Sequence, residues 1–131
     1  MVGIDIISVV RISDFVQKFG IKALKRFLSD AEISMCVPDF YRCRSSFDIK
    51  GVNFSRVAGF WAAKEACSKA LGVGIGRELG FLDMSISKSK ANVPSMMLSD
   101  DKMAYFNIKQ IALSISHDSG FAVAVVFCHK C

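Results

Sequence analysis

The sequence predicts an α+β fold in which a small antiparallel sheet packs against one long central helix. Small residues recur at every fourth position of residues 55–71, which is typical of a closely packed helix; they are Ala58, Ala62, Ala66 and Ala70. In residues 111–116 apolar side chains alternate with small ones at the period of a strand. A turn signal at residues 118–120 leads into a second apolar run at 121–128, so a hairpin is expected there.

The N-terminal half is expected to contain one strand and three short helices. Residues 2–7 form an apolar strand interrupted by Asp5. Ser13 or Asp14 is expected to start a helix that ends at Gly20, and residues 21–28 form the second. The third is expected to begin at Asp30, because residues 29–32 have the capping-box pattern S-x-x-E. Residues 36–54 show no clear period and are interpreted as a mobile loop with room for one helical turn.

Further strands and one helix are expected after the central helix. Gly72 fits the position just past its end. Strands are expected at residues 82–87 and 94–98, and Asp100 is expected to cap a helix that runs to about Lys109. No repeat, low-complexity tract or long linker divides the sequence, so residues 1–131 are expected to form a single domain.

Composition predicts a cytoplasmic protein with an acidic partner. The longest apolar run, residues 121–128, is far shorter than the roughly 20 residues of a membrane-spanning helix. The N-terminus lacks the pattern of a signal peptide, and no membrane contact is expected. The net charge of +5 fits nucleic acid, anionic lipid, a phosphorylated small molecule or an acidic protein. Basic residues gather in one N-terminal stretch, at Arg11, Lys18, Lys22, Lys25 and Arg26.

Two further features of composition concern assembly and thiols. A hydrophobic fraction of 52% suggests that another subunit covers part of the apolar surface. The five cysteines are expected to be free thiols, because their number is odd and the context is cytosolic. Cys128 and Cys131 have zinc-ligand spacing, but no second ligand pair accompanies them, and a strand end before a frayed terminus is favoured.

Four polar side chains are candidates for chemistry, and each also fits a structural role. Asp5 lies within an apolar strand and needs a partner, either a basic side chain or a divalent cation. Glu65 and Lys69 share a helix face, either as a surface ion pair or as a magnesium ligand beside a phosphate-binding ammonium. His117 precedes a turn, where it either reaches a neighbouring site or is only a satisfied polar group.

A glycine-rich run, GVGIGRELG, spans residues 72–80. It follows a helix instead of joining a strand to one, which argues against a dinucleotide-binding fingerprint. The run is either a flexible loop or a close backbone approach to a ligand.

Together these segments resemble the small, single-domain branch of the 4'-phosphopantetheinyl transferase superfamily. Residues 27–32 and 72–77 also match, and the order and spacing of all five segments over most of the chain are specific. The resemblance rests mainly on Gly3-Ile4-Asp5-Ile6, on Ala62-Ala63-Lys64-Glu65-Ala66 followed by Ser68-Lys69-Ala70, and on Ser114-Ile115-Ser116-His117.

The resemblance implies transfer of 4'-phosphopantetheine from coenzyme A to a serine of an acyl carrier protein, in support of fatty acid biosynthesis. It implies that Asp5 and Glu65 hold Mg²⁺, that Glu65 and Lys69 are catalytic, and that Lys69, Gly72 and His117 contact coenzyme A. It also implies carrier docking by the basic N-terminal stretch, beginning at Arg11. Members of this branch are homotrimers with each site at a subunit interface.

Two departures from the family pattern affect the site. The family usually has an arginine immediately before Phe-Ala-Ala-Lys-Glu-Ala. In this sequence Phe60-Trp61 stands in place of that Arg-Phe pair, so the arginine is absent. Arg56 lies on the same helical face as Phe60, and we hypothesise that it supplies the missing phosphate contact. The segment 33–54 looks longer than in typical relatives, so family contacts cannot be transferred to it.

Two other functions fit part of the sequence. A nucleic-acid-binding module would explain the charge, but it would not explain Asp5 or Glu65. It would also favour aromatic side chains interleaved with arginines on a strand, a pattern not seen here, so no nucleic-acid partner is predicted. An inactive assembly subunit with the same fold is the second alternative.

Overall fold

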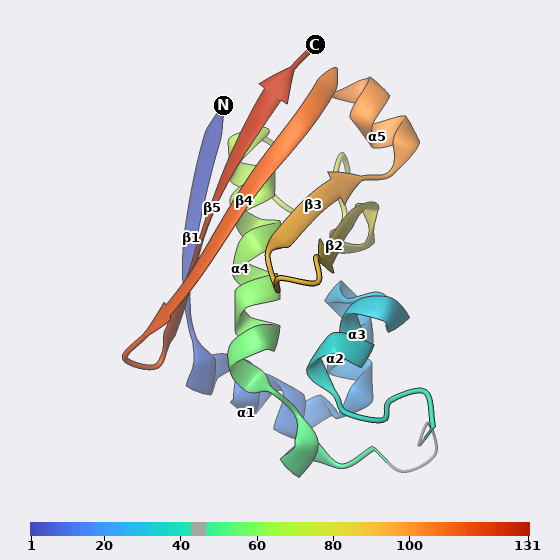
Figure 1. Ribbon diagram of the computed structural model, residues 1–131, viewed down its shortest axis with the longest axis vertical. Helices are drawn as coiled ribbons and strands as arrows, with labels where there is room; N and C mark the ends of the chain where they lie inside the picture. The colour runs from blue at the N-terminus through green and yellow to red at the C-terminus, as the bar shows by residue number, and fades with distance from the viewer. Residues whose placement is uncertain (43–46) are drawn as a thin grey trace.

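A long helix, α4 (Phe54–Ala70), lies across one face of a three-stranded sheet (Figure 1). The computed structural model describes residues 1–42 and 47–131. The sheet has the order β1-β5-β4, and both pairs of strands are antiparallel. The predicted α+β class with a central helix is therefore confirmed. The strands are β1 (Val2–Ser8), β4 (Ile108–Asp118) and β5 (Phe121–Lys130).

Small residues allow helix and sheet to approach each other closely. The alanines between α4 and β5 are fully buried, at Ala58, Ala62, Ala66, Ala122 and Ala124. At Gly3 of β1 the approach is so close that a Cβ would overlap the carbonyl oxygen of Ala66. Because side chains alternate along a strand, Asp5 lies on the same face as Gly3. The glycine thus brings the strand, and with it Asp5, against the helix.

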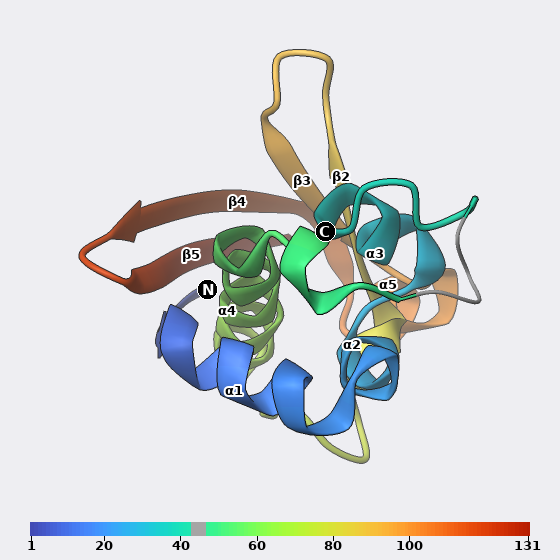
Figure 2. The ribbon, with the colours of Figure 1, turned by 90° about the horizontal axis from the view of Figure 1, so that it is seen from below.

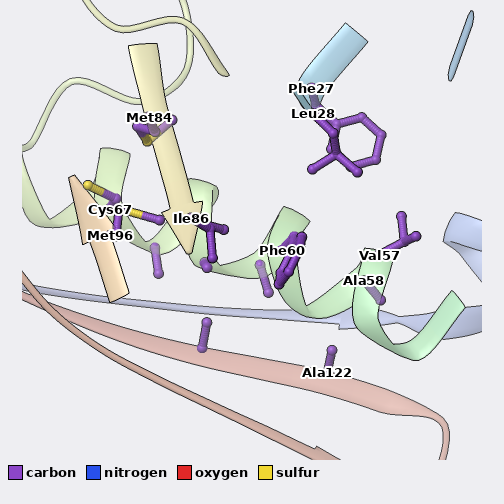
Figure 3. Packing of buried hydrophobic residues seen from close by; sticks show 14 of the residues in the cluster. Phe27, Leu28, Val57, Ala58, Phe60, Cys67, Met84, Ile86, Met96 and Ala122 are labelled. Carbon is purple, nitrogen blue, oxygen red and sulfur yellow. The ribbon is translucent and has the colours of Figure 1, made fainter. Parts of the chain in front are cut away.

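A second layer covers the other side of α4. It contains the hairpin of β2 (Met84–Lys88) and β3 (Pro94–Leu98), whose loop projects away from the rest of the chain (Figure 2). The helices α2 (Ile21–Phe27) and α3 (Asp30–Cys36) lie beside it. Cover on several sides explains why most residues of α4 are buried. The labelled side chains of this core include Phe27, Leu28, Phe60, Met84, Ile86 and Met96 (Figure 3).

The predicted start of the first helix at Ser13 or Asp14 is wrong. α1 (Val9–Phe19) follows β1 directly, because Ser8 is its N-cap and its Oγ accepts a hydrogen bond from the backbone N–H of Arg11 at 3.3 Å. Both predicted starting residues lie inside the helix. The predicted end is confirmed at Gly20, whose φ of 68° favours glycine.

The next helix boundaries show one success and one error. The capping box of α3 is confirmed, because Ser29 and Glu32 exchange both of its hydrogen bonds. α5 (Asp100–Tyr105) has Ser99 at its N-cap, so the prediction of Asp100 as cap is wrong. This helix also ends before Lys109, because Asn107 has a positive φ of 56° and the chain then enters β4.

The remaining boundaries differ from prediction by a few residues. β4 extends beyond its predicted range at both ends. β5 extends beyond its predicted range at the C-terminal end only. β2 starts at Met84 because η2 (Phe81–Asp83) forms a short 3₁₀ helix before it. In the segment 36–54 the expected helical turn is η1 (Ile49–Gly51), while residues 43–46 of the predicted loop lie outside the described residues.

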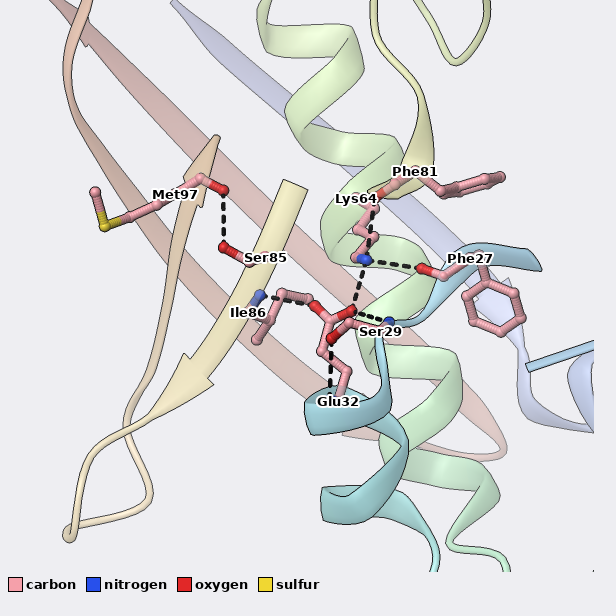
Figure 4. A network of polar contacts seen from close by, with 8 residues as sticks. All are labelled: Phe27, Ser29, Glu32, Lys64, Phe81, Ser85, Ile86 and Met97. Carbon is pink, nitrogen blue, oxygen red and sulfur yellow. Dashed lines mark hydrogen bonds and ion pairs between the residues drawn. The ribbon is translucent and has the colours of Figure 1, made fainter. Parts of the chain in front are cut away.

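A buried ion pair joins α4 to the second layer (Figure 4). Lys64 Nζ donates to Glu32 Oε1 at 2.8 Å and to the carbonyl oxygens of Phe27 and Phe81. The other Glu32 oxygen accepts from the backbone N–H of Ile86 at 2.7 Å. Neither charged side chain is more than 1% exposed. The pair therefore fixes four separate segments relative to the helix that carries Glu65.

Candidate functional site

The first half of the candidate site lies where β1 meets the C-terminal half of α4. Lys69 Nζ donates to Asp5 Oδ1 at 2.9 Å and to the carbonyl oxygen of Ile4 at 3.2 Å. The Asp5 side chain is 16% exposed and that of Lys69 52%, so the group faces solvent at one side. Glu65 lies one helical turn before Lys69 on the same face. The predicted trio of Asp5, Glu65 and Lys69 is thus brought together.

Two carboxylates and two basic side chains lie close together in this half. Burial raises the pKa of Glu65, and the nearby charge of Asp5 raises it further, against the opposing effects of Lys69 and Arg11. The hydrogen bond to Asp5 is the main reason why the pKa of Lys69 is raised, with both carboxylate charges adding to it. Two carboxylates that repel each other are a site where a cation is favourable.

The donor set of this half fits magnesium. Among the residues that the structure describes, no group of three or more His, Cys, Asp or Glu side chains is arranged to hold a metal. Magnesium keeps several waters and commonly takes only one or two carboxylates when it binds a phosphorylated substrate. Asp5 and Glu65, with an ammonium group beside them for phosphate, meet that requirement.

Gly72 lies at the same end of α4 as this acidic pair. Its backbone N–H donates to the carbonyl oxygen of Lys69 at 3.0 Å, and its φ of 75° lets the chain turn away from the helix. The glycine-rich run therefore starts just past the end of α4, three positions after Lys69, where its backbone can approach a ligand.

The second half of the candidate site is a cavity of about 360 Å³ at the N-terminal end of α4. Arg56, Phe60, Lys88 and His117 line it together with Asn53, Ser55, Gly59, Asn92, Pro94 and Ile115. The Nε2–H of His117 donates to the carbonyl oxygen of Ser55 at 2.7 Å. Arg56 Nη1 donates to the carbonyl oxygen of Met35 at 2.8 Å, which fixes its guanidinium at the cavity. The sequence analysis did not identify Lys88 as part of this cavity.

One chain does not bring the two halves together. Arg56 and Glu65 are nine positions apart in the sequence, and at about 100° per residue they lie on opposite sides of the helix. The predicted coenzyme-binding residues are therefore divided. Lys69 and Gly72 lie with the acids, whereas Arg56 and His117 lie at the cavity.

The predicted docking residues are spread over two helices, with Arg11 near the acidic half. Their side chains are exposed on α1 and α2, at Arg11, Lys18, Lys22, Lys25 and Arg26. Arg11 is near enough to Glu65 for its charge to oppose the raised pKa of that carboxyl. The sequence analysis missed an aromatic groove of about 330 Å³ next to them, formed by Phe15, Arg26, Phe27, Trp61 and Phe81. No local sequence pattern indicated this groove, because its side chains come from α1, α2, α4 and η2.

The outer face of the three-stranded sheet is apolar and exposed. Ile4 and Ile6 of β1 are 61% and 62% exposed, and Phe127 of β5 is 54% exposed. Val2, Val125 and Phe127 also line a shallow hollow with Leu113 of β4. A contiguous apolar face of this kind is typical of a surface that another chain covers.

Known proteins resemble the chain over nearly its whole length. Residues 1–126 match the 4'-phosphopantetheinyl transferase superfamily. A holo-[acyl-carrier-protein] synthase from Helicobacter acinonychis is 54% identical over 126 residues, which is 96% of this chain and 97% of that protein. Within the described residues, no helix is long and apolar enough to cross a membrane.

Two solved structures add evidence about fold and ligand. The structure of Helicobacter pylori holo-[acyl-carrier-protein] synthase in complex with coenzyme A is 51% identical, with a TM-score of 0.84 and coverage of 98% of this chain and 100% of that one. The Bacillus anthracis enzyme in complex with coenzyme A (3',5'-ADP) is 33% identical, with a TM-score of 0.74 and coverage of 99% and 96%.

Proposed function

Because the chain belongs to the 4'-phosphopantetheinyl transferase superfamily, as a holo-[acyl-carrier-protein] synthase, we propose a magnesium-dependent reaction at Asp5 and Glu65. The enzyme transfers 4'-phosphopantetheine from coenzyme A to a serine of apo acyl carrier protein, giving the holo carrier and 3',5'-ADP. The observation that carries the proposal is the pair of repelling carboxylates beside Lys69.

The residues of the acidic half have distinct roles in this proposal. Magnesium held by Asp5 and Glu65 would offset charge on the pyrophosphate as the bond breaks. The carrier serine Oγ forms a bond to the phosphorus next to pantetheine, and the bond from that phosphorus to the oxygen of 3',5'-ADP breaks. Glu65 takes the serine proton through a water. Lys69 stabilises the leaving phosphate as a point charge.

Magnesium dependence is tested by the mass of the carrier. Apo carrier protein is incubated with the enzyme and coenzyme A, either with magnesium or with a chelator. We expect a mass gain of one phosphopantetheine with magnesium and none with the chelator. Equal gain in both samples would refute the metal site, and no gain in either would favour an inactive assembly subunit.

We further propose that the complete site forms between subunits of a homotrimer. The acidic half and the cavity lie on opposite sides of α4, so one coenzyme A can contact both if the second half comes from a neighbouring chain. The exposed apolar sheet face offers a surface for this contact.

The oligomer can be tested at Ile4 on that face. Replacement by lysine places a charge in an apolar contact, and we expect monomers by light scattering with loss of transfer. Leu82→Lys is the matched control, because Leu82 is also 61% exposed but lies in η2 and not on the sheet. A variant Ile4→Lys that stays trimeric would show that the sheet face is not the interface.

The exposed basic residues of α1 and α2 are proposed to dock the acidic carrier. Opposite charges across an interface mainly raise the association rate, and salt screens them. We expect the Michaelis constant for the carrier to rise with sodium chloride, and Lys22→Glu to raise it about tenfold at low salt. Lys130→Glu, at the end of β5, is the control. A carrier constant that is indifferent to ionic strength would contradict docking by charge.

A cytoplasmic location is also proposed. Four cysteines among the described residues are free thiols, at Cys36, Cys67, Cys128 and Cys131. Free thiols persist in reducing compartments, whereas oxidising ones favour disulfides.

A further inference from the structure

The glycine-rich run is held by hydrogen bonds at both ends. The backbone N–H groups of Val73 and Gly74 donate to the carbonyl oxygen of Ser68 at 3.2 and 3.4 Å, which ties the start of the run to α4. The N–H of Gly76 donates to the carbonyl oxygen of Leu79 at 2.9 Å, and the Leu79 side chain is buried. The two residues between Gly76 and Leu79 are exposed and form the tip of a turn.

The tip of this turn is attached to α5 through Glu78. Lys102 Nζ donates to the carbonyl oxygen of Glu78 at 2.6 Å, and the Tyr105 hydroxyl donates to Glu78 Oε2 at 3.1 Å. The same ammonium group lies 5.5 Å from the centre of the Tyr105 ring, which is close enough for a cation–π contact. Two side chains on one face of α5 therefore bind both the main chain and the side chain of a single loop residue.

α5 is itself fixed to the strands on either side of it. The backbone N–H of its N-cap, Ser99, donates to the carbonyl oxygen of Asp83 at 2.8 Å, and beyond its C-terminal end the carbonyl oxygen of Asn107 accepts from the N–H of Cys131 at 3.0 Å. The helix contacts β3 and β4 at the same end of the molecule as the C-terminal end of α4 (Figure 1). A hydrogen bond from an ammonium group is stronger than a neutral one, so Lys102 ties the turn to a firm support.

We propose that Lys102 and Tyr105 are positioning residues that hold the glycine-rich run in the conformation that accepts coenzyme A. They act through Glu78 and not on the donor itself. A loop that is already ordered loses less conformational entropy when it binds a ligand, so this attachment lowers the concentration of coenzyme A that the enzyme needs. The proposal rests on the proposed function, in which coenzyme A binds beside Lys69, three positions before the run begins.

Hydrogen exchange of backbone amides tests the attachment without ligand, metal or turnover. We expect Lys102→Met to speed exchange at the N–H of Gly76 about tenfold, because the turn that protects this N–H loses its support. Lys102→Arg keeps a cationic donor and should retain most of the protection. Exchange in the buried middle of α4 should change in neither variant, which separates a local effect from global destabilisation. Equal exchange at Gly76 in Lys102→Met and the unchanged protein would refute the attachment.

Steady-state kinetics test whether the attachment serves the reaction. We expect Lys102→Met to raise the Michaelis constant for coenzyme A about fivefold while kcat stays within about twofold, and Tyr105→Phe to raise that constant less. Lys109→Met, at an exposed lysine of β4, is the matched control and should change neither constant. Glu78→Gln should also behave like the unchanged enzyme, because Lys102 binds the main chain and the glutamine oxygen still accepts from Tyr105.

Two results are inconsistent with a positioning role. They are a Michaelis constant for coenzyme A that does not change in Lys102→Met, and a loss confined to kcat. Failure of the proposed function is separate: the unchanged enzyme would transfer no phosphopantetheine, while exchange at Gly76 would still differ between that enzyme and Lys102→Met.

Discussion

Glu65→Gln should nearly abolish transfer, lowering kcat/KM by roughly a thousandfold, or about 4 kcal/mol of transition-state stabilisation. Glutamine keeps the size of the side chain but removes both the metal-binding charge and the proposed base. Asp5→Asn should have a similar effect, because it removes the other carboxylate and the partner of Lys69. Initial rates with coenzyme A, magnesium and apo carrier measure both variants.

The control for these variants is an acid outside the site. Glu78 accepts a hydrogen bond from the Tyr105 hydroxyl at 3.1 Å on an exposed surface, and Glu78→Gln should keep normal activity. Activity of Glu65→Gln within tenfold of the unchanged enzyme would rule out Glu65 as both ligand and base.

Lys64→Met should lower the free energy of unfolding by about 3–5 kcal/mol, because it leaves the carboxylate of Glu32 buried without its charged partner. Burial lowers the pKa of Lys64, and the charge of Glu32 opposes that effect. Urea denaturation at one fixed protein concentration measures the loss, since assembly makes stability depend on concentration.

A second ion pair on the same helix provides the comparison. Lys69 and Asp5 lie 2.9 Å apart, close to the 2.8 Å of Lys64 and Glu32, but Lys69 is 52% exposed, so Lys69→Met should cost less than about 1 kcal/mol. The double variant Glu32→Gln/Lys64→Met should recover part of the loss, because no uncompensated buried charge remains. Equal losses for Lys64→Met and Lys69→Met would show that burial does not decide the cost.

Local patterns predicted much of the fold. The alanines at every fourth position of α4 indicated close packing, because only small side chains fit between the helix and the sheet. The capping box at Ser29 was equally readable, because both of its hydrogen bonds are local. The start of α1 was not, because Ser8, Ser13 and Asp14 are all good cap residues and only the end of β1 decides among them.

Part of the site could also be predicted from local sequence patterns. Asp5, Glu65 and Lys69 were grouped correctly, since two of them share a helix face and the ordered motifs supply the third. The separation of Arg56 from Glu65 follows from helical geometry, but only once the length of α4 is known. Lys88 and the buried state of Lys64 depend on tertiary packing, and charged residues are rarely buried.

The most direct test of a site shared between subunits is complementation. Glu65→Gln carries a defective acidic half, and the double variant Arg56→Ala/His117→Ala a defective cavity. Co-refolding equal amounts should pair an intact acidic half with an intact cavity at about one interface in four, whatever the ring size. We predict recovery of about a quarter of normal activity, although each variant alone is nearly inactive. If the mixture is no more active than the mean of its two parents, the site lies within one chain.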